Sequence, residues 1–117
     1  MPKTDVFAMK VSKVYPMYID KVVKKGQDPA GVDTLISWLT GYDQKTIHKR
    51  IEEEDVDFRT FFTEAPNINP NADKITGWIC GHRVQDMEPG LMKQLRWLDK
   101  IIDELSKGKA LDKIMRS

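Results

Sequence analysis

The feature that most limits the fold of this chain is a regular apolar stripe near its C-terminus. The stripe consists of Leu91, Leu95, Leu98, either Ile101 or Ile102, and Leu105. Apolar residues at spacings of three and four lie on one face of an amphipathic α-helix. Pro89 lies near the start of the pattern and Gly108 follows it, so the sequence predicts one long helix between them.

Two earlier segments carry the same periodicity with clear end signals. The first starts at Tyr15, tolerates Pro16 in its first turn, and ends at Gly26. For the second, Asp28 is the expected cap and Gly41 follows the last turn. Each segment predicts one helix with a single buried face.

Shorter helices are predicted in the middle of the chain. Asp43 is placed to cap a surface helix that ends in the acidic run 52–55. Asp57 is placed to cap a short helix rich in phenylalanine, which Pro66 closes. The Asn- and Pro-rich stretch 67–71 is typical of a turn, and residues 110–115 predict one short closing helix.

The segment Ile75–Met87 fits either a helix or a strand. Ile75, Ile79 and His82 fit one helical face, but Gly77 and Gly81 weaken both elements and alternate with apolar residues as in a strand. Because no partner strand is evident elsewhere, we favour a helix.

Together these segments predict an all-α fold, a compact bundle of five or six helices. The 117 residues are expected to form a single helical domain, with residues 1–11 as a loose N-terminal arm. The hydrophobic fraction of 40% and the charged fraction of 32% are those of a folded rather than a disordered chain.

Composition also limits compartment and cofactors. A single cysteine, Cys80, leaves no internal disulfide and is typical of a reducing compartment. No apolar stretch resembles a signal peptide or a membrane span, so a cytoplasmic location is expected and no membrane association. With His48 and His82 as the two histidines, a typical zinc site cannot be built, and we expect no metal and no cofactor.

One candidate ligand-binding region lies around the predicted turn and the ambiguous segment. It comprises Asn69, Asn71, Lys74, Cys80, His82 and Arg83. Cys80 and His82 share a face only if the segment is a strand, and a buried inert thiol is the alternative. Arg83 offers paired donors to an anion, or else an ion pair to Asp86 or Glu88. The asparagines offer amides to a ligand, or else cap local turns.

A second candidate is a helix-turn-helix over Leu35–Ile51, with Gly41 in the turn. Its groove-facing residues would be Lys45, Thr46, His48 and Lys49. The neighbouring acidic run repels phosphates, and 19 basic against 18 acidic residues supply no electrostatic steering. Nucleic acid is therefore an unlikely partner.

The basic residues suggest a third possibility. Lysines concentrate in the first helix and in the C-terminal tail, whereas the third and fourth helices are acidic. If the termini fold together, a basic face would lie opposite an acidic one and guide a protein partner or a homo-oligomer. The alternative is a distribution that serves solubility alone.

Three stretches of the sequence resemble a known family. They are VYPMYIDK at 14–21, WLTGY at 38–42, and the block from Asp57 to Ala110. The chain is similar over its whole length to short, uncharacterised bacterial proteins catalogued as a domain of unknown function, numbered twenty-two hundred. The resemblance implies an all-helical orthogonal bundle and favours a helix for Ile75–Met87. It implies no activity, ligand or catalytic residue.

The sequence leaves the biochemical function unknown. We favour a small cytoplasmic helical binding or interaction protein without catalytic activity, because no catalytic set is apparent. A small-ligand binder or enzyme using the Asn69–Arg83 region is the first alternative. DNA binding through Leu35–Ile51 is the second.

Overall fold

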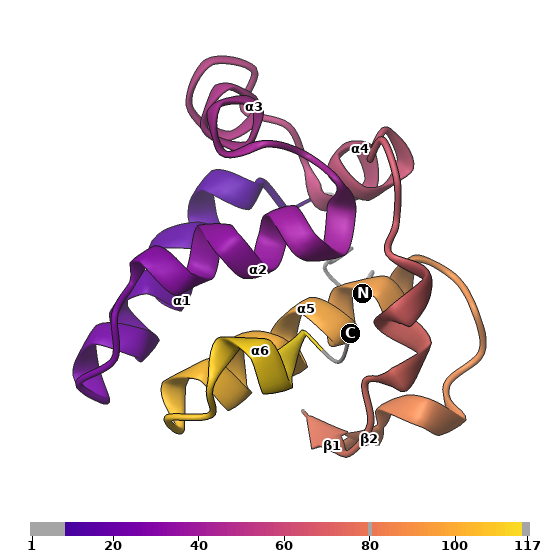
Figure 1. The fold of residues 1–117 in the computed structure, drawn as a ribbon. Helices are drawn as coiled ribbons and strands as arrows, with labels where there is room; N and C mark the ends of the chain where they lie inside the picture. Colours follow the sequence, from indigo (N-terminus) through magenta and orange to yellow (C-terminus); the bar gives the residue numbers. More distant parts are fainter. Residues whose placement is uncertain (1–8, 80, 116–117) are drawn as a thin grey trace, which may run out of the picture.

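The computed structural model describes residues 9–79 and 81–115. Its six α-helices are α1 (Val11–Lys24), α2 (Ala30–Thr40), α3 (Gln44–His48), α4 (Phe58–Thr63), α5 (Leu91–Ser106) and α6 (Leu111–Ile114) (Figure 1). A π-helix, η2 (Lys49–Glu53), continues α3, and two 3₁₀-helices, η3 (Pro70–Lys74) and η4 (Val84–Asp86), lie in the connections. The predicted all-α fold is confirmed.

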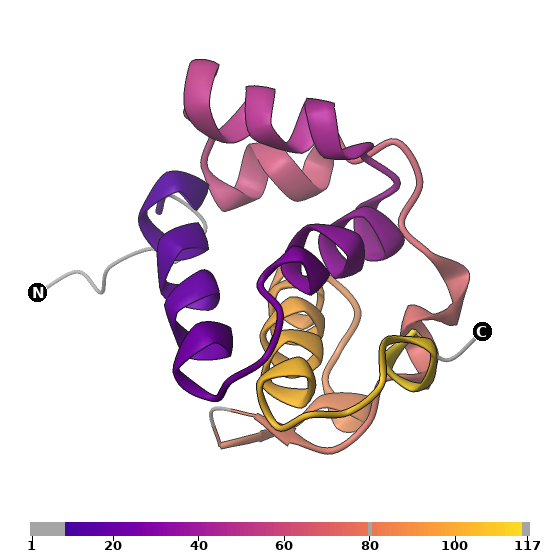
Figure 2. The same ribbon diagram turned by 60° about the vertical axis from the view of Figure 1, so that its left-hand side comes forward.

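The predicted C-terminal helix, α5, lies at the centre of the molecule. It contacts α1, α2, α4 and α6 as well as the short hairpin and η4. Figure 2 shows α5 in the middle of the molecule, with α1 on one side of it and α6 on the other. Leu98, Ile101 and Ile102 are fully buried, so both isoleucines of the predicted stripe serve the core.

Local end signals place α2, α3 and α4 as the sequence predicts. The side chain of Asp43 accepts a hydrogen bond from the backbone N–H of Thr46 at 2.7 Å, and Asp57 does the same for Thr60 at 2.8 Å. Gly41 ends α2 in the left-handed conformation, with a φ of 83°. These bonds satisfy backbone groups that helix ends leave unpaired.

Helix α1 begins earlier than predicted, and Pro16 lies inside the helix rather than in its first turn. The N–H of Val11 donates to the carbonyl of Val56 at 3.0 Å, and the N–H of Phe58 donates to Met9 at 3.1 Å. Residues 9–11 therefore belong to the folded structure and not to a loose arm. The rest of the predicted arm, residues 1–8, lies outside the described residues.

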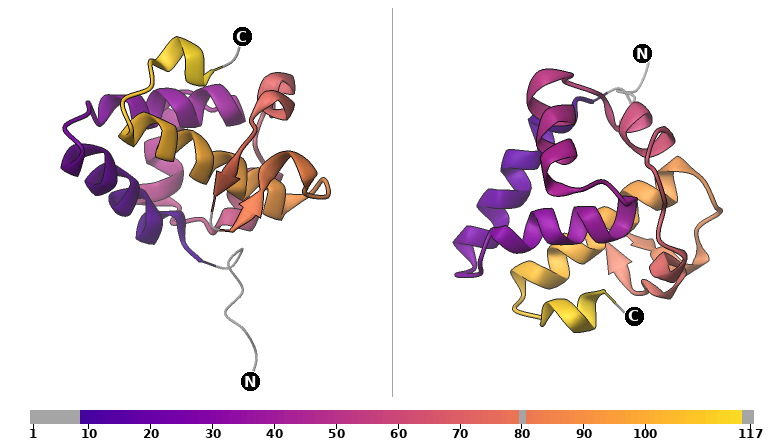
Figure 3. Two further views of the ribbon diagram at one scale, coloured as in Figure 1. Left: turned by 90° about the horizontal axis from the view of Figure 1, so that it is seen from below. Right: turned by 45° about the horizontal axis from the view of Figure 1, so that its top comes forward.

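The helix that we favoured for Ile75–Met87 is wrong. The segment forms a two-stranded antiparallel hairpin in which β1 (Trp78–Ile79) pairs with β2 (His82–Arg83), followed by η4. Figure 3 shows the two arrows beside α5. Gly77 and Gly81 have φ values of 108° and 79°, which a right-handed helix does not allow. The missing partner strand lies within the segment itself.

Candidate functional site

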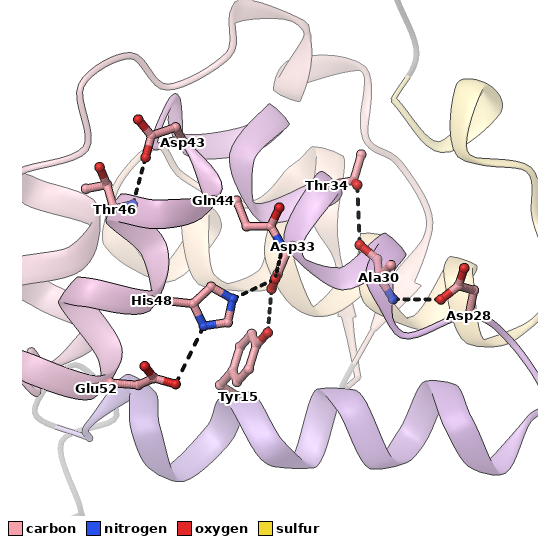
Figure 4. Close-up of polar contacts among 10 residues, drawn as sticks. All are labelled: Tyr15, Asp28, Ala30, Asp33, Thr34, Asp43, Gln44, Thr46, His48 and Glu52. Carbon is pink, nitrogen blue, oxygen red and sulfur yellow. Dashed lines mark hydrogen bonds and ion pairs between the residues drawn. The ribbon is translucent and has the colours of Figure 1, made fainter.

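A buried carboxylate, that of Asp33, lies where α1, α2 and α3 meet. Asp33 is 8% exposed, although its position in α2 is next to the solvent-facing Thr34. The left-handed Gly41 and the Asp43 cap turn the chain sharply between α2 and α3. This turn brings the first residues of α3 back over the side of α2 that carries Asp33 (Figure 4).

Three side chains donate to this carboxylate. The Tyr15 hydroxyl from α1 donates to Oδ1 at 2.5 Å. The Gln44 amide nitrogen lies 3.1 Å from Oδ2, and His48 Nε2 lies 2.8 Å from the same oxygen. Charge-assisted bonds of this kind are short and directional, and they fix the position of the carboxylate. The network therefore locks three helices around one charge.

The imidazole of His48 has a second carboxylate on its other side. Its Nδ1 lies 3.7 Å from Glu52 Oε1, at the i+4 position in η2, and its ring packs edge-on against Tyr15 with centroids 5.9 Å apart. The hydrogen bond to Asp33 raises the pKa of His48 above its usual value, against a smaller opposing effect of burial. Burial and then the Asp33 hydrogen bond raise the pKa of the Tyr15 hydroxyl.

These shifts limit what the network does chemically. Because its pKa is raised, His48 holds its proton over a wider pH range, so less neutral imidazole is available to accept a proton. The raised pKa of Tyr15 likewise keeps its hydroxyl protonated. The donors of Tyr15, Gln44 and His48 are all directed at one carboxylate. The arrangement is suited to holding a charge in place rather than to moving protons.

A hollow of about 210 Å³ opens on one side of this network. Its lining residues are Asp33, Thr34 and Ser37 from α2 and Gln44 from α3. On the far side of His48, a second hollow of about 250 Å³ is lined by Lys45, His48, Lys49, Glu52 and Glu53. The first hollow is lined by uncharged polar groups and one carboxylate, and the second by charges of both signs.

The outer face of α1 carries a different kind of surface. The Met17 side chain is 63% exposed and lines two hollows, one of about 380 Å³ and one of about 260 Å³. The larger is completed by Asp20, Lys21 and Lys24, and the smaller by Val14, Tyr18, Lys21, Ile79 and Asp99. Met17 thus forms an exposed apolar ridge that borders both hollows.

Hydrogen bonds hold two residues that line the smaller of these hollows. The Tyr18 hydroxyl donates to Asp99 Oδ1 at 2.6 Å, and Arg96 Nη1 donates to Asp99 Oδ2 at 2.8 Å. These bonds tie α1 to α5 beneath Met17. The shape of the α1 surface is therefore set by the central helix.

The residues of the predicted ligand-binding region are not brought together at the Asp33 network or on the outer face of α1. Asn69 accepts from the N–H of Asn71 at 2.8 Å and donates to the carbonyl of Trp38 at 3.2 Å, so it begins η3 and anchors it to α2. Lys74 ends η3 with an exposed side chain. Arg83 pairs with Asp86 at 3.4 Å, the ion pair given as its alternative role. Cys80 lies outside the described residues, and His82 is placed only as a strand residue.

The predicted nucleic-acid residues lie in α3 and at the start of η2, which continues it, but they differ in environment. Lys45 and Lys49 are exposed and line the same hollow as Glu52 and Glu53. The Thr46 backbone is bound by the Asp43 cap, and His48 contacts Asp33. One of the four side chains therefore belongs to the buried network, and the two lysines lie among carboxylates.

The sequence interpretation missed Tyr15, Asp33, Gln44 and Met17. One local signal pointed to Asp33, since it is a charged residue between the stripe residues Val32 and Ile36 of α2. The other three are recognisable only when α1, α2 and α3 are packed. In the described residues, no group of three or more His, Cys, Asp and Glu side chains is placed to hold a metal ion. The described helices are also too short or too polar to span a membrane.

Residues 5–116 match the model of a family described as an uncharacterized protein conserved in bacteria, DUF2200. The chain belongs to the DUF2200 family. A solved structure described as the crystal structure of uncharacterized protein SP1917 is similar to this DUF2200 chain, with 36% identity and a TM-score of 0.88. The match covers 97% of the DUF2200 chain and 93% of the other. No curated protein matches the DUF2200 chain.

Proposed function

We propose that this chain is a small interaction protein without catalytic activity, and that it acts by associating with a second copy of itself through the outer face of α1. The observation that carries the proposal is the Met17 ridge, an exposed apolar side chain that borders both hollows. The smaller hollow brings Met17 together with Val14, Tyr18 and Ile79, and contiguous apolar surface of this kind is typical of a protein interface. The self-contained bonding of the Asp33 network supports a role other than acid–base catalysis.

A second copy is the occupant that this surface fits best. A two-fold interface must be self-complementary, because the same patch contributes from both subunits. A ridge beside a hollow meets this condition, since the ridge of each copy enters the hollow of the other. The face also carries both charge signs, with Asp20 next to Lys21 and Lys24. A net charge of +1 adds little repulsion between copies.

A matched pair of variants in α1 tests the proposed self-association. Met17 and Val23 are both exposed in α1, but Val23 does not line either hollow. We expect sedimentation equilibrium to show a concentration-dependent dimer for the wild type and for Val23→Ser. For Met17→Ser we expect a dissociation constant at least about tenfold higher, because an apolar interface residue is lost.

Two results would reject the proposed function. A wild-type chain that stays monomeric at the highest concentration contradicts self-association. A Met17→Ser variant that dimerises as strongly as Val23→Ser places the interface elsewhere. Because both residues are exposed, matching thermal unfolding of the two variants shows that a change in association is not a loss of folding.

We further propose a cytoplasmic location. The support is the use of a single cysteine in the sequence, which is typical of proteins in a reducing compartment. Fractionation of cells that make the protein from its own gene tests this. Recovery in a secreted or periplasmic fraction would contradict it.

A further inference from the structure

The hollow beside Asp33 presents hydrogen-bond acceptors. The Gln44 amide nitrogen donates to Asp33, which leaves its carbonyl oxygen as an acceptor, and the Thr34 hydroxyl donates to the carbonyl of Ala30 at 3.3 Å. Asp33 Oδ2 accepts two bonds, whereas Oδ1 accepts one from Tyr15 and retains a second acceptor position. A ligand that enters between these groups must therefore supply donors.

The acceptors are also held in place before a ligand arrives. Asp33 is fixed by donors from α1 and α3, and the four lining residues come from two helices joined by the short turn at Gly41. Sites built on packed helices lose little conformational entropy on binding. The hollow of about 210 Å³ has room for a planar group of a few atoms but not for a large ligand.

We propose that the hollow lined by Asp33, Thr34, Ser37 and Gln44 binds the guanidinium or ammonium group of a small cation. A guanidinium group carries five donors in one plane and no acceptor, which matches a lining of acceptors around one carboxylate. This site is separate from the α1 surface of the proposed function. Its test does not depend on self-association.

The groups around Asp33 make the binding of a cation depend on pH. The titratable and charged groups around Asp33 and His48 are Tyr15 from α1, Glu52 from η2, and the exposed Lys45 and Lys49. A proton on His48 neutralises part of the carboxylate charge that a cationic ligand would use. Ligand binding and His48 protonation therefore oppose each other, and by linkage a bound cation lowers the pKa of His48.

Amide NMR with methylguanidinium chloride as the probe tests the site, with sodium chloride at equal ionic strength as the reference. We expect saturable shifts at the Gln44 side-chain amide and at the Asp33 and Ser37 backbone amides with methylguanidinium alone. In the same wild-type samples, the His48 pKa measured from its ring resonances should fall at saturation. Affinity should rise as the pH increases through the His48 titration.

Two substitutions by leucine give a matched control. Ser37→Leu fills the hollow without removing a donor to Asp33, whereas Thr63→Leu adds the same side chain at the exposed last residue of α4. We expect methylguanidinium to bind Ser37→Leu at least about tenfold more weakly, and Thr63→Leu as the wild type. A second probe, arginine blocked at both ends, separates two sources of the ligand group. Tighter binding than methylguanidinium indicates a protein side chain, and equal or weaker binding indicates a free small molecule.

The proposal is overturned if sodium chloride produces the same shifts, or if the shifts do not saturate. Unchanged binding to a folded Ser37→Leu variant also overturns it. The His48 readout needs no substitution, so a His48 pKa that does not move at saturating methylguanidinium rejects the site even if Ser37→Leu fails to fold.

Discussion

Single residues in this protein matter through the bonds they fix between elements, and Asp33 is the clearest case. Its carboxylate joins α1, α2 and α3 through Tyr15, Gln44 and His48. Removing one partner of a buried charge costs more than the bond itself, because the remaining charge stays buried. A change in protonation within the Asp33 network therefore affects the packing of three helices.

The His48 contact makes stability depend on pH. Because the folded-state pKa of His48 is raised, its pairing stabilises the fold fully below the unfolded-state value of about 6.5 and is lost as the pH rises through the folded value. We expect His48→Gln to reduce the free energy of unfolding more at pH 6 than at pH 9. Urea unfolding of both proteins at the two pH values measures this, and an equal reduction at both would contradict it.

Gly41 is the glycine whose replacement should cost most among the turn positions. Its φ of 83° is unfavourable for other residues, and an added Cβ would lie 2.9 Å from the backbone nitrogen of Asn67. Gly26 is the matched control, since it has a φ of 76° with open space around it. We expect Gly26→Ala to cost about 1 kcal/mol and Gly41→Ala about 2 kcal/mol or more in thermal unfolding. Equal losses of stability in the two variants would show that Asn67 moves away from the added Cβ without further cost.

Whole elements differ in how far local sequence determines them. The ends of α2, α3 and α4 were predictable because Gly41, Asp43 and Asp57 act on backbone groups within a few residues. The hairpin was not, because two glycines adopt positive φ and an added Cβ at Gly77 would lie 2.9 Å from the Lys100 side chain of α5. Gly77 thus lies against Lys100, a residue 23 positions further along the chain, which local sequence does not reveal.

The cap of α4 provides a prediction at this scale. The hydrogen bond from the Thr60 N–H lowers the pKa of Asp57, so its stabilisation is present above the unfolded-state value of about 3.9 and is lost as the pH falls through the folded value. We expect Asp57→Ala to lower the urea midpoint at pH 7, with a smaller loss for Asp57→Asn, which keeps an acceptor. The difference in urea midpoint between the wild type and Asp57→Ala should become smaller at acidic pH. A difference that does not change with pH would show that the cap stabilises α4 without its charge.

For the whole molecule, the periodicity of apolar residues was enough to predict a helical bundle with one long helix near the C-terminus, but not that this helix is central. The candidate surfaces were not predictable in the same way, because Asp33 and Met17 acquire part of their surroundings from other elements of the fold. The predicted site residues Asn69 and Arg83 illustrate the converse, since their local alternatives, a turn and an ion pair, are what the structure contains. Local pattern thus determines elements more reliably than it determines sites.

The central claim is that the outer face of α1 is the interface between two copies, and amide NMR during dilution tests it most directly. We expect chemical shifts to change with protein concentration at Met17, Asp20, Lys24 and Ile79, around the ridge and its hollows. Amides of α3 and α4 should not change. Shifts that are independent of concentration, or that change on α3 rather than on α1, would contradict the account.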